Sequence, residues 1–236
     1  MELLKVPYDA QALFKERPNR FLGIVDIFEP VVQRNVKIHI HDPGRLPDLL
    51  SEGVKVRLKK ADNPNRKTGW DLLAVKKKDQ WVFTNSAYHR KLMENLLSNK
   101  KLAPIKSIKN IFPEIKVGAS RLDFCLELQN NQKVYVETKG CTLALKGRAL
   151  FPDAPTSRGR KHLLELIQLK QEGQRAALIM LIFRKDALSF GPHYEIDPEF
   201  GKILKQAIDK RVELYPIRIE YKEGRLVYKG RLPFSI

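Results

Sequence analysis

The chain has 236 residues, 43% of them hydrophobic, so it can bury one or two cores. Its 44 Lys and Arg against 27 Asp and Glu give a formal net charge of +17. This charge favours a polyanionic partner such as nucleic acid or an anionic membrane surface. The alternative is that the charge belongs to a lysine-rich, heat-adapted protein surface. The longest apolar run, Ala176 to Phe183, is too short to span a bilayer, and no signal-peptide pattern is present. A count of two cysteines argues against a disulfide framework, so we expect a cytoplasmic protein without a membrane partner.

Residues 1–84 carry the pattern of short strands separated by turns. We expect strands over Arg20–Pro30, Arg34–His41, Gly53–Lys60, Gly69–Lys78 and Gln80–Asn85. The intervening segments DPGR and DNPNRKTG have turn chemistry. So many short strands predict a small β-barrel, either of the OB type that binds nucleic acid or an unrelated one.

After Asn85, helical and strand patterns alternate. We expect helices over Ser86–Lys101, Thr156–Gly173 and Asp197–Val212, and strands over Val117–Leu128, Lys133–Thr138, Arg175–Phe183, Val212–Tyr221 and Arg225–Lys229. The segment Arg175–Phe183 is apolar on both faces and is therefore expected at the centre of a sheet. The chain is thus predicted to be an α/β (α+β) protein with an OB-like barrel over 1–84 and a mixed-sheet domain over 85–236.

Three charged residues stand on the two strands that flank Asn130 and Asn131. Asp123 lies on the first strand, and Glu137 and Lys139 lie on the second. If the apolar faces are buried together, even-numbered positions lie beside even-numbered ones, and these three side chains share the opposite face. Two adjacent carboxylates repel each other unless a cation lies between them, and Mg²⁺ suits such oxygen ligands. Lys139 would then polarise an attacking water or hold a phosphate; the alternative is a surface salt bridge.

The order Asp123, Glu137, Lys139 resembles the PD-(D/E)xK nuclease signature. Five longer segments look like the sugar fermentation stimulation protein A family over nearly the whole chain: RFLGIV (20–25), HDPGRL (41–46), GASRLDF (118–124), YVETKGCTL (135–143) and FPDAPTSRGRKHLLEL (151–166). The resemblance implies an N-terminal OB-like domain, a C-terminal domain with a restriction-endonuclease-like fold, DNA binding, and a link to sugar (maltose) metabolism.

The motif and the cations around it give a set of expected site residues. The resemblance assigns catalysis to Asp123, Glu137 and Lys139. It assigns a Mg²⁺ or Mn²⁺ ion to Asp123 and Glu137, with Glu94 on the first helix as a further ligand. The expected DNA contacts are Arg121, Lys146, Arg148, Arg158, Lys161 and His162, and the expected supporting residues are Asp153 and Glu165.

The chemistry indicated is metal-dependent hydrolysis of phosphodiester bonds by a largely sequence-nonspecific protein that binds single- or double-stranded DNA. The alternative is a non-enzymatic DNA-binding regulatory factor. The sequence is compatible with a monomer or a homodimer. His39 and His41 share a strand face and are expected to be structural or phosphate-facing rather than zinc ligands, while Trp70 and Trp81 are expected in the barrel core rather than stacked on bases.

Overall fold

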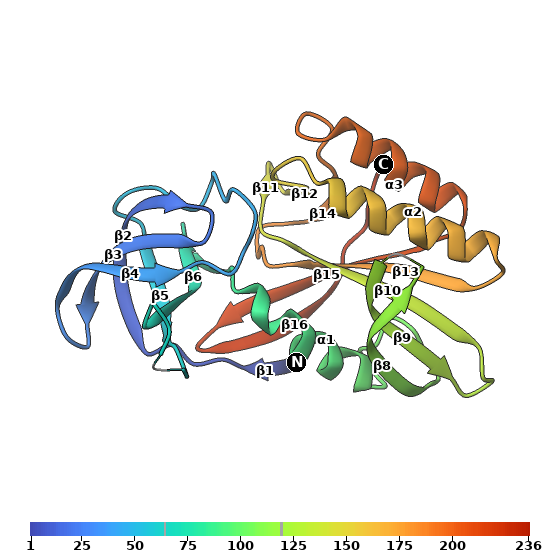
Figure 1. The fold of residues 1–236 in the computed structure, drawn as a ribbon, viewed down its shortest axis with the longest axis horizontal. Coiled ribbons are helices and arrows are strands. Elements are labelled where there is room, and N and C mark those ends of the chain that lie inside the picture. Colours follow the sequence, from blue (N-terminus) through green and yellow to red (C-terminus); the bar gives the residue numbers. More distant parts are fainter. Residues whose placement is uncertain (64, 119) are drawn as a thin grey trace.

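The N-terminal part of the chain forms a closed barrel (Figure 1). The computed structural model describes residues 1–63, 65–118 and 120–236, so Pro64 in a predicted turn and Ala119 in a predicted strand lie outside the described residues. The barrel strands are β2 (Ala10–Asn19), β3 (Leu22–Glu29), β4 (Gln33–His39), β5 (Lys55–Lys60) and β6 (Trp70–Lys77). They pair in the order β4-β3-β2-β5-β6, and a short parallel pairing of Ile38 with Trp70 closes the barrel.

Two strands from the N-terminal 84 residues pair with the larger unit. β7 (Gln80–Phe83) pairs antiparallel with β6 on one side and through Trp81 with Tyr221 on the other. β1 (Glu2–Lys5) pairs antiparallel with β16 (Arg225–Arg231). The predicted strand Gln80–Asn85 therefore bridges the two units, and the unpredicted β2 takes its place in the barrel.

The larger unit is built on a mixed sheet. Its strands run in the order β1-β16-β15-β13-β10-β9-β8, and β7 continues this sheet into the barrel. The remaining bounds are β8 (Ile108–Val117), β9 (Ser120–Leu128), β10 (Lys133–Cys141), β13 (Arg175–Ile182) and β15 (Glu213–Lys222). β10, β13 and β15 are parallel, whereas β8, β9 and β10 form an antiparallel meander. β13 is buried on both faces at the centre of the sheet, which confirms the prediction from its composition.

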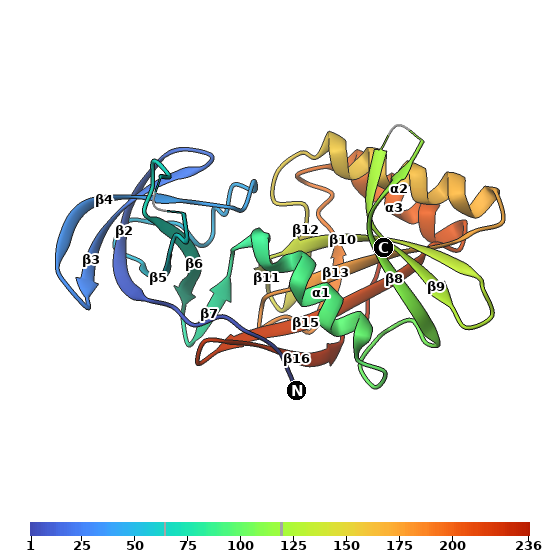
Figure 2. The same cartoon turned by 60° about the horizontal axis from the view of Figure 1, so that its bottom comes forward.

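Helices cover both faces of this sheet (Figures 1 and 2). A 3₁₀ turn (Ser86–Tyr88) leads into α1 (His89–Ser98) on one face, and α2 (Ser157–Gln171) and α3 (Pro198–Asp209) lie side by side on the other. α2 begins where the Thr156 hydroxyl accepts the Gly159 N–H at 3.1 Å, and α3 begins where the Asp197 carboxylate accepts the Phe200 N–H at 2.9 Å. These side-chain caps satisfy helix N–H groups that have no partner within the helix.

A second, small sheet lies between β10 and α3 in the sequence. It consists of β11 (Ala144–Leu145), β12 (Arg148–Phe151) and β14 (Ser189–Pro192). β12 and β14 are parallel, and the C-terminal segment joins them because Phe190 accepts the Ser235 N–H through its carbonyl. β12 is followed directly by the segment that leads into α2, so this sheet positions the start of that helix.

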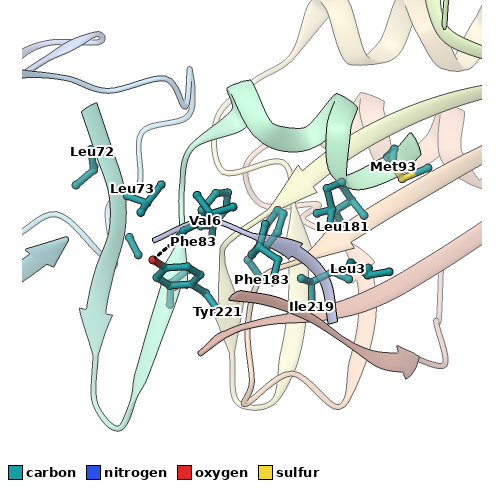
Figure 3. Close-up of a cluster of buried hydrophobic side chains, with 14 of the residues drawn as sticks. Leu3, Val6, Leu72, Leu73, Phe83, Met93, Leu181, Phe183, Ile219 and Tyr221 are labelled. Carbon is teal, nitrogen blue, oxygen red and sulfur yellow. Dashed lines mark hydrogen bonds between the residues drawn. The ribbon is translucent and has the colours of Figure 1, made fainter. Parts of the chain in front are cut away.

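The barrel and the larger unit share one hydrophobic core (Figure 3). At the junction, the ring of Phe83 packs against those of Phe183 and Tyr221, with centroid separations of 5.6 and 5.4 Å. The Tyr221 hydroxyl donates to the Val6 carbonyl at 2.8 Å, which ties the N-terminal segment to the same cluster. A second core fills the space between the sheet and α2 and α3. Continuous apolar packing across the junction fixes the orientation of the barrel relative to the sheet.

Candidate active site

The β9–β10 hairpin aligns the three charged motif residues. Val134 pairs with Leu126 and Val136 with Phe124, so even-numbered positions face each other, as the apolar pattern predicts. Continuing this register places Glu137 opposite Asp123. The Asp123 carboxylate accepts the main-chain N–H of Thr138 through Oδ2 at 2.7 Å. The two carboxylates therefore lie side by side at the end of the hairpin.

Glu137 is the most enclosed member of the group, with only 1% of its surface exposed. Its Oε1 contacts the ammonium of Lys139 and Nδ1 of His162. Its Oε2 is buried and has no hydrogen-bond partner among the described residues. A buried carboxylate oxygen without a partner is costly, so this atom is the strongest local sign that a further group binds here.

The protonation of the two carboxyl groups differs. Burial opposes ionisation of Glu137, but the hydrogen bond from His162 and the charge of Lys139 outweigh it and hold its pKa below the usual value. Burial raises the pKa of Asp123 to about 6, and the negative charge of Glu137 adds to that shift. Glu137 is thus the ionised partner, and the second negative charge is disfavoured without a cation.

α2 brings His162 to the motif from a distant part of the sequence. His162 is 4% exposed and lies on the buried face of the helix. Because a carboxylate only accepts hydrogen bonds, the contact with Glu137 requires the proton on Nδ1 of His162. We expected His162 to contact DNA, but its burial against Glu137 excludes a surface contact and gives it a positioning role instead.

A cavity of about 620 Å³ opens at this end of the hairpin, and both units line it. Asp123, Glu137 and Lys139 form one wall, while Arg20 and Asp42 from the barrel and Arg158 from α2 form others. The candidate site is therefore built at the junction that the shared core makes rigid, which the motif alone did not indicate.

Asp42 and Asp153 place a second pair of carboxylates on the barrel side of the cavity. Oδ2 of Asp153 accepts the Leu46 N–H at 3.0 Å and holds the barrel loop. Gly44 is required at this contact, because a Cβ there would lie 2.4 Å from Oδ2 of Asp153. Burial raises the pKa of Asp42 to about 6, and the negative charge of Asp153 contributes. Asp153, which was expected to support the site, links the two units through its hydrogen bond to Leu46.

The first helix presents a histidine, not Glu94, to the cavity. His89 lines it, packs flat against Phe183 at a centroid separation of 5.2 Å, and occupies the space that a side chain on Gly140 would need. Glu94 does not line the cavity; it pairs with Nε of Arg90 at 3.2 Å, one turn away on α1. Glu94 is therefore not placed with the carboxylate pair, and the expectation that it binds the metal is corrected.

The expected DNA contacts fall into two groups. Arg158 is exposed at the cavity, Lys161 is exposed on the next turn of α2, and Lys146 is exposed in the turn between β11 and β12. Arg121 is exposed on β9, two residues before Asp123, where it pairs with Glu114 of β8. Arg148 instead donates to the Ser235 carbonyl at 2.8 Å and serves the C-terminal segment.

Several site residues had no usable sequence signal. Asp42 stands in a predicted turn and in the segment HDPGRL, but nothing local predicts its approach to Asp153. Arg160 pairs with the buried Asp197 at 2.8 Å, an ion pair that fixes the start of α2 against α3. Glu165, expected to support the site, lies one turn beyond His162 and is not part of the cavity wall; its Oε2 is buried and has no hydrogen-bond partner among the described residues.

The carboxylate pair fits a hard divalent cation. Glu137 Oε2 is unpartnered within the described ranges, and Asp123 resists ionisation beside it. Within those ranges no three His, Cys, Asp or Glu side chains converge as a metal-ligand group. Mg²⁺ is commonly held by one or two carboxylates while keeping several waters, so a pair is sufficient for it.

Comparison with known proteins places the chain in a family. Residues 16–84 match the family described as SfsA N-terminal OB domain, and residues 87–225 match the one described as Sugar fermentation stimulation protein RE domain. A curated relative from Methanococcoides burtonii, a sugar fermentation stimulation protein homolog, is 43% identical over 98% of this chain and 94% of its own length. The chain belongs to the sugar fermentation stimulation protein family. It therefore has an N-terminal OB domain followed by a restriction-endonuclease-like domain, which confirms the predicted fold.

Other members of the SfsA family agree with this assignment. A homolog from Thermotoga neapolitana is 40% identical over 98% of this chain and 97% of its own length. The structure of Pyrococcus furiosus SfsA in complex with Ca²⁺ superposes with a TM-score of 0.91 at 28% identity, covering all of both chains. Among the described residues, no helix has the length and apolar character needed to cross a membrane.

Proposed function

We propose that this protein binds DNA and hydrolyses its phosphodiester bonds with a divalent cation, Mg²⁺ or Mn²⁺, held by Asp123 and Glu137. The observation that carries the proposal is the buried, unpartnered Oε2 of Glu137 beside the carboxylate of Asp123, on the wall of a cavity of about 620 Å³. The complex of the P. furiosus relative with Ca²⁺ supports a site for a hard divalent cation in this fold.

Each residue of the constellation has a distinct role in this proposal. Asp123 and Glu137 supply the negative charge and the oxygen ligands, and His162 orients Glu137 by donating from Nδ1. Lys139 pairs with Glu137 and also lines the cavity. Its positive charge would stabilise a scissile phosphate or an attacking water there. A bound divalent cation would lower the pKa of a coordinated water and neutralise charge on the phosphate.

The charge of the chain supports a DNA backbone as the partner. The formal net charge is +17, and Arg20 and Arg158 line the same cavity as the two carboxylates. Cations on the rim hold phosphates while the carboxylates hold the metal, an arrangement suited to a polyanion and not to a neutral substrate. The interaction is expected to be largely independent of base sequence, because phosphate contacts carry no sequence information.

A cleavage assay on several DNA forms tests the proposal. Wild-type protein with Mn²⁺ or Mg²⁺ is expected to cut at least one of single-stranded, duplex, nicked or flapped DNA, and Asp123→Asn and Lys139→Ala are each expected to abolish that activity. DNA binding in EDTA should persist in Asp123→Asn, since a negative charge near the phosphates has been removed. A wild-type protein that binds DNA and cuts none of these forms would be the non-enzymatic regulatory factor instead.

A further inference from the structure

The OB barrel presents a row of rings beside the cavity. Phe21, in the turn between β2 and β3, is 48% exposed. Its ring stacks on that of His39 with a centroid separation of 6.2 Å and an interplanar angle of 20°. His39 in turn meets the edge of His41 at 4.4 Å. A large apolar ring left half in water and backed by a second ring presents a flat face to solvent.

Both segments that carry these rings continue into the cavity wall. Arg20 precedes Phe21 and Asp42 follows His41, and both line the cavity. The Phe21 carbonyl accepts the Ile40 N–H at 2.9 Å, which holds the β2–β3 turn against the end of β4. β4 itself runs towards the junction of the two units in both views (Figures 1 and 2). The ring row therefore ends at the mouth of the candidate active site.

The row is held rigidly from beneath. His41 contacts Oδ1 of Asp71 through Nε2 at 3.2 Å, and Asp71 is also bound by Arg66 at 2.7 Å. A platform whose rings are already ordered loses little side-chain entropy when a ligand stacks on it. The two tryptophans of the barrel do not offer such a face, because both pack against the first core and the Arg57 guanidinium covers Trp81 at 4.2 Å.

We infer that Phe21 and His39 form a stacking platform for unpaired bases and guide a single-stranded segment of DNA into the cavity that holds Asp123 and Glu137. Inside a duplex the base faces are covered by neighbouring bases, so along its length only a single-stranded segment offers base faces to Phe21. Base–aromatic stacking tolerates any sequence, which agrees with the net charge of +17 and with the arginine at the rim. This inference rests on the proposed function, since it names the form of DNA that the same site takes.

Substitution of Phe21 tests the platform in the full-length protein. The probe is an oligodeoxythymidine of about 12 nucleotides, a length within the range that one OB fold covers, with 2-aminopurine at its centre. Phe21→Leu keeps an apolar side chain but removes the ring. Phe28→Leu is the matched control, because Phe28 is 40% exposed on the same barrel at the opposite end of β3.

In EDTA, Phe21→Leu is expected to weaken binding of the single strand about tenfold, a loss within the range for one stacked base. The variant should also lose the quenching of 2-aminopurine fluorescence that stacking causes. Its affinity for a blunt duplex of equal length should stay within about twofold of the wild-type value, because the phosphate contacts are untouched. Phe28→Leu should match wild type on both probes. Unchanged single-strand affinity in Phe21→Leu, an equal loss on the duplex, or an equal loss in Phe28→Leu would each overturn the platform.

Failure of the platform and failure of the proposed function give different results. Calorimetric titration with Mn²⁺ reports on the carboxylate pair alone, and Phe21→Leu should leave it unchanged. If wild type binds no divalent cation and cuts no DNA, yet Phe21→Leu selectively loses the single strand, the proposed hydrolysis fails and the stacking platform stands. If Mn²⁺ binding and cleavage are present but both variants bind the single strand as wild type does, the platform fails and the proposed hydrolysis stands.

Discussion

The carboxylate of Asp123 accepts the main-chain N–H of Thr138 at 2.7 Å, across fifteen residues of sequence. This bond joins β9 to the stretch of β10 that separates Glu137 from Lys139. Because the donor is the main chain, the alignment depends on strand register and not on the threonine side chain. The hairpin therefore delivers two carboxylates and a lysine to one place, and burial raises the pKa of one of them, Asp123.

Replacing Asp123 with asparagine should stabilise the metal-free protein at neutral pH. Its folded-state pKa of about 6 lies above the value of about 3.9 in an unfolded chain. The folded state therefore binds more protons between about pH 4 and 6, and the free energy of unfolding falls as pH rises through that window. Asp123→Asn removes this loss while its side-chain oxygen still accepts the Thr138 N–H. Urea unfolding in EDTA should show a gain of about 1–3 kcal/mol at pH 7.5 and little change near pH 4; destabilisation at both pH values would contradict the account.

Removal of His162 should weaken metal binding without removing a ligand. Its ring is buried and donates to Oε1 of Glu137, so His162→Ala frees the carboxylate to rotate. Loss of such an orienting partner typically costs 10- to 100-fold in metal affinity. Leu164→Ala, an exposed position on the same helix, is the control and should bind Mn²⁺ as wild type does. Equal affinities for Mn²⁺ in wild type and His162→Ala, measured by calorimetry, would show that Glu137 needs no orienting partner.

The ion pairs of Arg184 should matter more to stability than an exposed pair. Arg184 has only 2% of its side chain exposed and binds Asp48 of the barrel at 2.7 Å and Asp186 at 2.8 Å. Arg184→Ala leaves the partly buried carboxylate of Asp48 without this partner, removes the donors to the Thr142 and Ala144 carbonyls, and should lower the free energy of unfolding by about 3 kcal/mol or more. Arg175→Ala, which breaks a pair with Glu213 at a more exposed site, should cost about 1 kcal/mol or less. Equal losses for the two variants in urea unfolding would argue against the junction pairs.

DNA affinity should fall steeply with salt and depend on the cavity rim. Each phosphate neutralised contributes about −0.9 to the slope of log K against log[salt] on a duplex. Arg158 lines the cavity, so Arg158→Ala should reduce the magnitude of this slope by about one. Arg225→Ala, which removes an exposed arginine paired with Glu2 on the outer edge of the sheet, should leave the slope unchanged. Identical slopes for wild type and Arg158→Ala in anisotropy titrations would place the phosphates elsewhere.

Local patterns predicted the elements that bury one face or both. The apolar segment at β13 and the amphipathic helices α2 and α3 appear where the periodicity indicated, and the parity of the β9–β10 hairpin follows from its apolar face. Strands with weak apolar signals were missed. β8 is an edge strand with exposed polar residues and a proline at position 113, and β2 buries two alanines, Ala10 and Ala12.

The acids and lysine of the site could be predicted from one hairpin, but the remainder of the cavity depends on tertiary contacts. Asp42 approaches Asp153 only because the barrel docks on the larger unit. Glu94 is the converse case: its position on the first helix suggested a ligand, yet helix packing turns His89 towards the cavity and leaves Glu94 with Arg90. Side-chain direction around a helix is set by which face packs on the sheet, and His89 and Glu94, which are five positions apart, lie on different faces of the helix.

Calorimetric titration with Mn²⁺ tests the central claim, that Asp123 and Glu137 together hold a divalent cation. The account predicts one Mn²⁺ site in wild type. Glu137→Gln should lose affinity by about 100-fold or more, on the order expected when an anionic ligand is removed. Lys139→Ala should retain its affinity for Mn²⁺, because lysine is not a ligand and its charge competes for Oε1 of Glu137. Absence of binding to wild type, or equal affinities for wild type and Glu137→Gln, would contradict it.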